Sequence, residues 1–299
     1  MEEYIAPNRK RIPYGMMNFA VIRRDDCYYV DKTRFIPIIE DADKFFFFIR
    51  PRRFGKSLTV NLFINEYDHF TNAIFADPES LHRYTNETHG EGYLRAFFNK
   101  VKAGTYSSIE RCFITGVSPV TMDDLTNGFN IGTNYSLSPK FNEMIGFTEE
   151  EVRQMLTYYS TTSHFNHTVD ELLDIMQPWY DNYCFAQGRY GETTMYNSNM
   201  VLYFIKNYLD NDGKAPQNMI ESNIRVDYEK LRMLIRKDKE FAHYASIIQT
   251  LVSQGYITGD LKESFPAVNI TTPDNFVSLL YYFGMLTICL LYTSDAADD

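Results

Sequence analysis

The stretch that decides the fold of this chain is FFFFIRPRRFGKS, residues 45–57. The uninterrupted apolar run at 45–49 predicts a short buried strand. The loop after it ends in Gly55-Lys56-Ser57, the ending of loops that hold a phosphate chain against the first turn of a helix. In such loops the lysine reaches the outer phosphates and the hydroxyl binds Mg²⁺. The stretch therefore predicts a nucleotide-binding strand–loop–helix unit, and an ordinary surface turn is the alternative.

The loop departs from the full phosphate-binding pattern at Arg50, which stands five residues before Gly55 where a glycine is expected. Arg52 and Arg53 follow closely. A run of charge is most often a solvated tip, but guanidinium groups beside a lysine repel one another unless an anion is near. Arginine also suits bidentate contact with phosphate. We therefore expect a modified phosphate cradle.

Composition limits the function classes. The 299 residues are enough for one large or two modest cores, and an aromatic content of 16% indicates a packed globular protein. A net charge of −10 argues against a general nucleic-acid binder. The four cysteines form no close pair, which predicts reduced thiols and a cytoplasmic protein. The polar, charged start predicts no signal peptide.

The first half of the chain is predicted to alternate short strands and helices, as an α/β protein does. We expect a strand at 28–30, a short helix starting at 31–33, the strand at 45–49 and a helix that opens at 57–62. A further short buried strand is expected at 111–115. Thr115 and Ser118 follow at its carboxyl end, where α/β sheets place ligand contacts. They are either phosphate-sensing groups or ordinary turn residues before Pro119.

The second half is predicted to be mostly helical. Thr148 and Glu151 form a capping box, followed by an apolar stripe at 152, 155, 156 and 159. A second stripe at 241, 244, 245, 248 and 252 ends at Gly255. The uncharged run 276–292 is nearly long enough to span a membrane, but Thr272-Pro273 and Gly284 are typical of a soluble helix, with a strand at 285–288 after it. Short strands near Ile257 and Leu286 predict a helical or winged-helix-like domain.

Taken together, these stretches resemble the predicted AAA-ATPase-like proteins of bacteria, in which a P-loop ATPase domain precedes a PD-(D/E)XK nuclease-like domain. The matching stretches are IPYG at 12–15, YVDKT at 29–33, RPRRFGKSL at 50–58, NEYDHF at 65–70, TGVSPV at 115–120, GFN at 128–130, GFT at 146–148, WYDNY at 179–183 and GMLTI at 284–288. The resemblance covers residues 10–288. An arginine-rich loop without the first glycine is itself typical of this family.

The resemblance implies a set of site residues for ATP and Mg²⁺. The cofactor-binding residues are Arg52, Arg53, Phe54, Gly55, Lys56, Ser57, Leu58 and Thr115. The resemblance also makes NEYD at 65–68 the Walker B end, with Glu66 as the catalytic residue that orients water. Ser57 and Asn65 are then the metal ligands. Asn65 stands where the family has Asp, and a neutral amide attracts Mg²⁺ less than a carboxylate does.

The spacing between the two motifs is too short for the family's arrangement. Only residues 58–64 separate Ser57 from Asn65, which is barely two helical turns at 1.5 Å per residue. A crossover to a parallel strand needs a dozen or more residues. Either 65–68 has become part of the loop's helix, or part of the ATPase core is missing. We favour the second alternative, an internal deletion or mis-joined gene.

The end of the chain also departs from the family. Residues 289–299 look like an in-frame translation of a sequencing adapter, with an ordinary acidic tail as the alternative. We therefore predict an incomplete P-loop domain at 1–147, which lacks a stretch near 62–65, and a helical C-terminal domain at 148–288.

Two functions follow from this reading. The first is a P-loop protein that binds ATP and hydrolyses it very slowly or not at all. The second is a non-enzymatic interaction or regulatory module, in which the aromatic stretch 179–183 contacts a protein partner and the P-loop is a relic. A core position for those aromatics is the more common alternative. We expect a nucleotide partner, a protein partner or homo-oligomer as a further option, no membrane contact, and nucleic acid only by family analogy.

Overall fold

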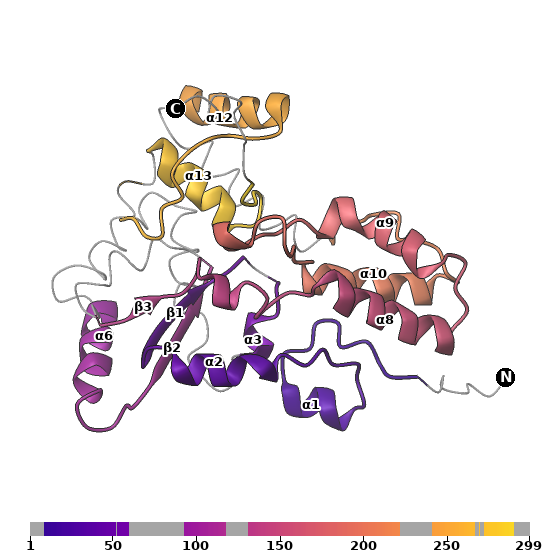
Figure 1. Ribbon diagram of the computed structural model, residues 1–299, viewed down its shortest axis with the longest axis horizontal. Helices are drawn as coiled ribbons and strands as arrows, with labels where there is room; N and C mark the ends of the chain where they lie inside the picture. The colour runs from indigo at the N-terminus through magenta and orange to yellow at the C-terminus, as the bar shows by residue number, and fades with distance from the viewer. Residues whose placement is uncertain are drawn as a thin grey trace, which may run out of the picture.

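A computed structural model describes residues 9–51, 53–59, 93–117, 131–221, 241–266, 269 and 272–289. Within these ranges the protein is a mixed α/β structure with a small parallel sheet, as the sequence predicts. Its elements in chain order are α1 (Phe19–Arg24), η1 (Thr33–Phe35), α2 (Ile36–Asp41), β1 (Phe45–Ile49), α3 (Lys56–Thr59), α6 (Tyr93–Gly104), β2 (Cys112–Gly116), β3 (Thr133–Asn134), η2 (Pro139–Phe141), α8 (Glu149–Thr162), α9 (Val169–Tyr180), η3 (Gln187–Arg189), α10 (Ser198–Asp210), α12 (Phe241–Gln254) and α13 (Pro273–Tyr282). Figure 1 shows the sheet beside α2 and α6, the α8–α10 helices as a separate bundle, and α12 beyond α13.

The strands predicted at 45–49 and 111–115 are confirmed, and they form the sheet together. Its order is β2-β1-β3, and both neighbours run parallel to β1. Residues 46–49 of β1 are all buried, as expected for a strand that is covered on both faces. In the register of β1 with β2, Phe48 pairs with Thr115 and Ile49 with Gly116. The loop after β1 therefore leaves the carboxyl edge of the sheet, with a neighbouring strand on each side of β1.

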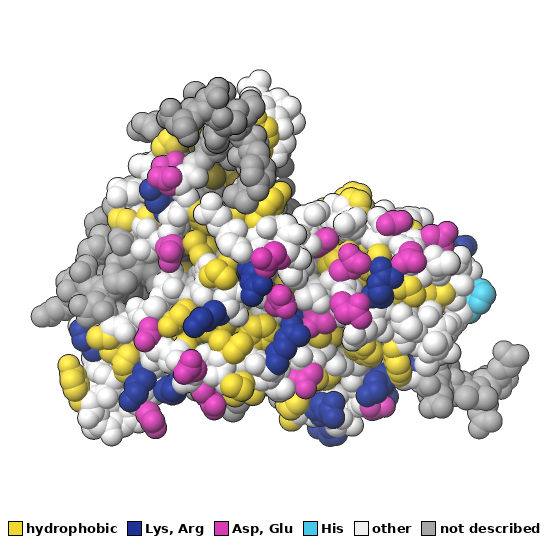
Figure 2. All heavy atoms as spheres, viewed as in Figure 1, with side chains coloured by type: hydrophobic (Ala, Val, Ile, Leu, Met, Phe, Trp, Pro, Cys, Tyr) yellow, Lys and Arg dark blue, Asp and Glu magenta, His cyan; other side chains and the backbone are white. Residues whose placement is uncertain are grey.

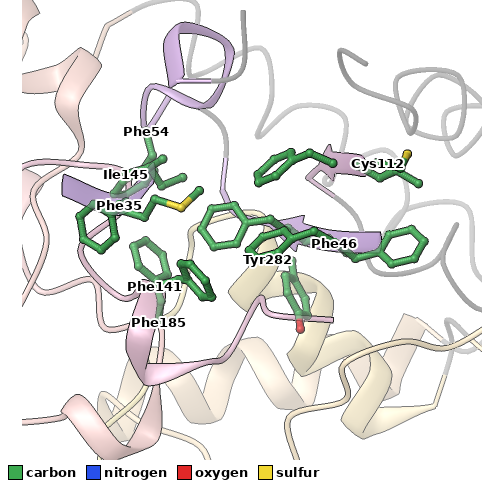
Figure 3. Packing of buried hydrophobic residues seen from close by; sticks show 14 of the residues in the cluster. Phe35, Phe46, Phe54, Cys112, Phe141, Ile145, Phe185 and Tyr282 are labelled. Atoms are coloured by element: carbon green, nitrogen blue, oxygen red, sulfur yellow. The ribbon is translucent and has the colours of Figure 1, made fainter. Parts of the chain in front are cut away.

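Aromatic side chains fill the core around β1. The Phe46 ring stacks on Phe113 at 4.8 Å and on Tyr135 at 4.6 Å between centroids, and meets the Phe141 ring edge-on at 5.0 Å. Tyr282 of the distant helix α13 joins the same cluster, as the close-up in Figure 3 shows. This core therefore contains residues from both sides of position 147, where the sequence predicts a domain boundary.

The α8–α10 bundle has its own core. The predicted capping box is confirmed in both halves: the Glu151 amide donates to Thr148 Oγ1, and the Thr148 amide donates to the Glu151 carboxylate. The predicted stripe of α8 is buried as well. A second capping box, at Thr168 and Glu171, starts α9. On the face drawn in Figure 2, acidic side chains gather over the region of α8 and α9, whose first turns are rich in Asp and Glu.

Of two predictions for the N-terminal region, one is wrong and one is confirmed. No strand forms at 28–30: Tyr28 donates one backbone hydrogen bond to Arg11 O, beside an isolated bridge between Arg11 and Cys27. The short helix expected to start at 31–33 is confirmed: η1 begins at Thr33, whose amide donates a hydrogen bond to the Asp31 carboxylate. The segment is therefore held by single contacts rather than by a ladder.

The predictions for the C-terminal helices hold only in part. α12 ends before Gly255 and α13 starts at Pro273, as expected, and Gly284 takes the left-handed backbone that ends α13. Val252, however, is 83% exposed, so the stripe predicted for α12 does not extend to its last turn. The strands expected near Ile257 and Leu286 are absent from the described residues 241–266 and 272–289. These ranges therefore contain no pair of strands for the wing of a winged helix.

No helix in the described ranges is long and apolar enough to cross a membrane.

The β1 core generates the first testable prediction. Phe48 is fully buried, whereas Phe97 of α6 is 38% exposed. We expect Phe48→Ala to lower the free energy of unfolding by about 3–5 kcal/mol, since it leaves a cavity in a packed aromatic core. The control Phe97→Ala should cost less than half as much. Urea unfolding followed by circular dichroism measures both, and equal losses would contradict the burial of β1.

Candidate functional site

The 50–57 loop, defined as residues 50–57, runs from the end of β1 into the first turn of α3. Arg53 and Gly55 both have positive φ, at 67° and 90°, with Phe54 between them outside that region. These two left-handed residues turn the chain sharply before α3. The predicted helix after the loop is confirmed at its start, since α3 begins at Lys56.

Contacts with the rest of the chain hold the middle of the loop. The Phe54 ring is buried edge-on against Tyr183 at 4.8 Å and Phe185 at 5.3 Å. Phe54 O accepts a hydrogen bond of 2.8 Å from the Gly146 amide. Gly146 has a φ of 83°, and a Cβ there would lie 2.9 Å from the Phe54 ring. A side chain at position 146 would therefore displace the loop.

Arg50 has a structural role, which corrects the expectation of three arginines around an anion. Its side chain is 1% exposed and donates to three backbone carbonyls, those of Ile49 (3.1 Å), Ser136 and Phe141 (3.2 Å). The guanidinium carbon lies 4.2 Å from the Phe48 ring centroid and 4.5 Å from that of Phe185. Burial lowers the pKa of Arg50 to about 10, so it stays charged at neutral pH. The residue that replaces the first glycine thus anchors the loop.

Lys56 lies inside the loop. It is 5% exposed, and its Nζ donates hydrogen bonds of 2.9 Å to both Arg50 O and Pro51 O. The ammonium group is thereby placed against the first residues of the loop, beyond the carboxyl end of β1. Ser57, the next residue, is partly exposed.

Arg53 connects the loop to the helical bundle. Its guanidinium forms a 3.1 Å ion pair with Glu221, and the same Glu221 oxygen accepts a hydrogen bond of 3.0 Å from Asn199. Arg53 O accepts from the Asn199 amide and from Ser198 Oγ at the start of α10. Burial and the Glu221 carboxylate together raise the pKa of Tyr14 well above its ordinary value. This cluster therefore carries a carboxylate as well as cations.

The loop faces a cavity of about 750 Å³, within the range of ligand pockets. Its walls come from four parts of the chain: the 13–20 segment (residues 13–20), residues 28–36, the 53–58 stretch of the loop and α3, and the 144–147 turn together with α8 and α10. Figure 1 shows α3 between the sheet and the α8–α10 helices, with α1 below. The cavity thus joins segments that are far apart in sequence.

The structure brings together most of the predicted site residues it describes. Those that line the cavity are Arg53, Phe54, Gly55, Lys56, Ser57 and Leu58. Thr115 does not: it is 2% exposed, and its hydroxyl donates to Phe48 O at 2.6 Å within the sheet. Arg52, Asn65 and Glu66 lie outside the described residues. Within the described ranges, no cluster of three or more His, Cys, Asp or Glu side chains is arranged to hold a metal ion.

Sequence reasoning missed the residues that support the loop from a distance. Glu221, Asn199 and Ser198 contact Arg53 across more than 140 positions, and no local pattern marks them. Gly146 could have been found from the sequence, because the GFT stretch at 146–148 is one of those that carry the family resemblance. The conformation it needs is visible only in the structure.

A small parallel sheet with a glycine-lysine loop at its carboxyl edge places the described part of the chain in the α/β class. Comparison with known proteins supports the resemblance predicted from the sequence. The model of the family described as "Predicted AAA-ATPase" matches residues 13–63 and 59–126, so over these residues the chain is similar to the AAA-ATPase-like family. The predicted resemblance is confirmed for this part of the chain.

One curated relative is similar over a short stretch. It is a protein of Azotobacter chroococcum mcd 1 described as "Uncharacterized protein in vnfD 5'region", 52% identical over 55 residues, which are 18% of this chain. The matched stretch spans only 11% of that relative's length. No solved structure matches.

The role of Arg50 generates the second prediction. We expect Arg50→Lys to lower the free energy of unfolding by about 3–5 kcal/mol, because an ammonium cannot reach the carbonyls of Ser136 and Phe141 with the same planar fork. Arg34→Lys, a half-exposed arginine paired with Glu143, is the matched control and should change it by less than about 0.5 kcal/mol. Thermal and urea unfolding measure both. An Arg50→Lys protein as stable as the control would show that the buried guanidinium does not anchor the loop.

Proposed function

We propose that this chain binds ATP together with Mg²⁺ through the 50–57 loop. The observation that carries the proposal is the position of Lys56, a buried ammonium at the carboxyl end of a central parallel strand, on the wall of a ligand-sized cavity. Anions bind favourably at such strand ends, where loop amides and a lysine converge. The carbonyls of Arg50 and Pro51 accept from Lys56 in this structure, and outer phosphate oxygens would be the acceptors for its ammonium when a nucleotide is bound.

The neighbouring residues fit the same ligand. Ser57 lies on the cavity wall beside Lys56, where its hydroxyl would bind Mg²⁺ bridged to the phosphates. Arg53 would add charge-assisted hydrogen bonds to phosphate oxygens. The similarity of residues 13–126 to the AAA-ATPase-like family supports nucleotide and metal use in general terms.

We further propose that hydrolysis is very slow or absent. Phosphoryl transfer needs a group that orients the attacking water, and Glu66 is the residue that the resemblance gives for it. The family match falls into two segments that meet at residues 59–63, within the short interval between Ser57 and Asn65. This junction supports the view that part of the ATPase core, including a separate Walker B strand, is missing.

The third prediction tests nucleotide binding. We expect Lys56→Ala to weaken MgATP binding at least about tenfold, because it removes a charged hydrogen-bond donor to the phosphates. Lys44→Ala, which removes an exposed lysine next to β1, should leave the affinity unchanged. Isothermal titration calorimetry measures both, and thermal unfolding verifies that each variant is folded. The same affinity in Lys56→Ala as in the unaltered protein would refute the role of the loop.

The fourth prediction concerns Glu221. Its carboxylate competes with phosphate for Arg53 and repels a phosphate chain nearby. We expect Glu221→Gln to strengthen MgATP binding about two- to fivefold, an effect that added salt reduces. Glu143→Gln breaks a comparable ion pair, with Arg34, and should have no effect. Weaker binding by Glu221→Gln would show instead that the carboxylate positions Arg53 for the ligand.

A further inference from the structure

We propose that the base and ribose of the bound nucleotide lie between the 13–20 segment and the 50–57 loop, with the base against the side chains of Phe19 and Tyr29. This inference rests on the proposed ATP binding and names the residues that hold the other half of the ligand. Lys56 and Ser57 line the same cavity as the 13–20 segment. A molecule whose phosphates contact Lys56 therefore has continuous space toward Phe19.

The cavity wall formed by the 13–20 segment and Ile36 is apolar. Exposed large hydrophobic side chains are few in the described part of the chain, and three of them, Met17 (62%), Phe19 (42%) and Ile36 (50%), line this cavity. A cluster of exposed apolar side chains around a cavity usually marks a site for an apolar surface. The flat face of a nucleobase offers such a surface, whereas a phosphate chain does not.

The aromatic pair gives the wall a defined shape. The Phe19 ring meets the Tyr29 ring edge-on, with 5.1 Å between centroids. Asn18 caps α1 by accepting from the Val21 amide, which fixes the start of the helix and so the position of Phe19. An aromatic side chain held in this way presents a face or edge on which a planar ring can stack.

Four polar side chains on the cavity wall have protein partners. Lys32 is paired with Glu151 at 2.6 Å, Ser198 donates to Arg53 O, and Asn199 donates to Glu221. Asn18 is occupied by its capping bond. Away from the 50–57 loop, the cavity wall that a ligand can contact is therefore mainly apolar. Such a wall favours the nucleoside over a second anionic or strongly polar ligand.

The test compares MgATP with inorganic tripolyphosphate, which carries the phosphates without the nucleoside. We expect Phe19→Ala in the full chain to weaken MgATP binding about three- to tenfold, the loss of one aromatic stacking contact. Binding of Mg²⁺-tripolyphosphate should change less than twofold. Trp179→Ala removes an aromatic side chain that is 53% exposed on α9, outside the cavity, and is the matched control. Met17→Ala is a second variant on the same wall, chosen because the Met17 side chain is more exposed than those of Phe19 and Ile36.

The outcomes separate this inference from the proposed function. If Lys56→Ala weakens both ligands and Phe19→Ala and Met17→Ala leave MgATP affinity unchanged, ATP binding stands and this placement of the nucleoside is wrong. Unchanged MgATP affinity in these two variants is expected if the apolar wall binds a peptide or a second copy of the chain instead of the nucleoside. Equal weakening of both ligands by Phe19→Ala also overturns the placement, because the change then acts through the loop. If the unaltered protein binds neither ligand, both proposals fail.

Discussion

The buried guanidinium of Arg50 is the interaction on which the rest of the site depends. It follows directly after β1, lies against the rings of Phe48 and Phe185, and donates to the carbonyls of Ser136 and Phe141. A buried cation is costly unless its donors are satisfied, so these carbonyls cannot move away without a large loss of stability. The direction in which the chain leaves the sheet is thereby set, and Lys56 then donates to the carbonyls of Arg50 and Pro51.

The loop is also held from the side of the helical bundle. Phe54 is fixed by Gly146, Tyr183 and Phe185, and Arg53 is fixed by Ser198, Asn199 and Glu221. None of these partners belongs to the sheet. Helix α13 adds Tyr281 and Tyr282 to the core beneath β1. The candidate site is therefore assembled from both halves of the chain, and its geometry depends on how the bundle and α13 pack on the sheet.

Sequence patterns were reliable where one physical signal dominated a short segment. The four phenylalanines of β1, the apolar run of β2 and the capping box of α8 each formed as predicted, because burial and capping act within a few residues. Patterns failed where a pairing partner was needed. The stretches at 28–30, near Ile257 and near Leu286 have apolar residues but do not form strands, since a strand exists only if another strand is positioned to pair with it. The sequence predicts that Arg50, as one of the loop arginines, lies near a phosphate, but its side chain is buried and anchors the loop instead.

The amino-acid sequence by itself determined the strand–loop–helix unit, the cation at Lys56 and the resemblance to the AAA-ATPase-like family over residues 13–126. Each of these follows from the order of residue types within short stretches of the chain. The tertiary structure alone decided which arginine is buried, that Glu221 pairs with Arg53, and that the 13–20 segment lies across a cavity from Lys56. Those features arise from contacts between segments separated by tens to more than a hundred residues, and such contacts are set by how the helices and the sheet pack, which no local pattern encodes.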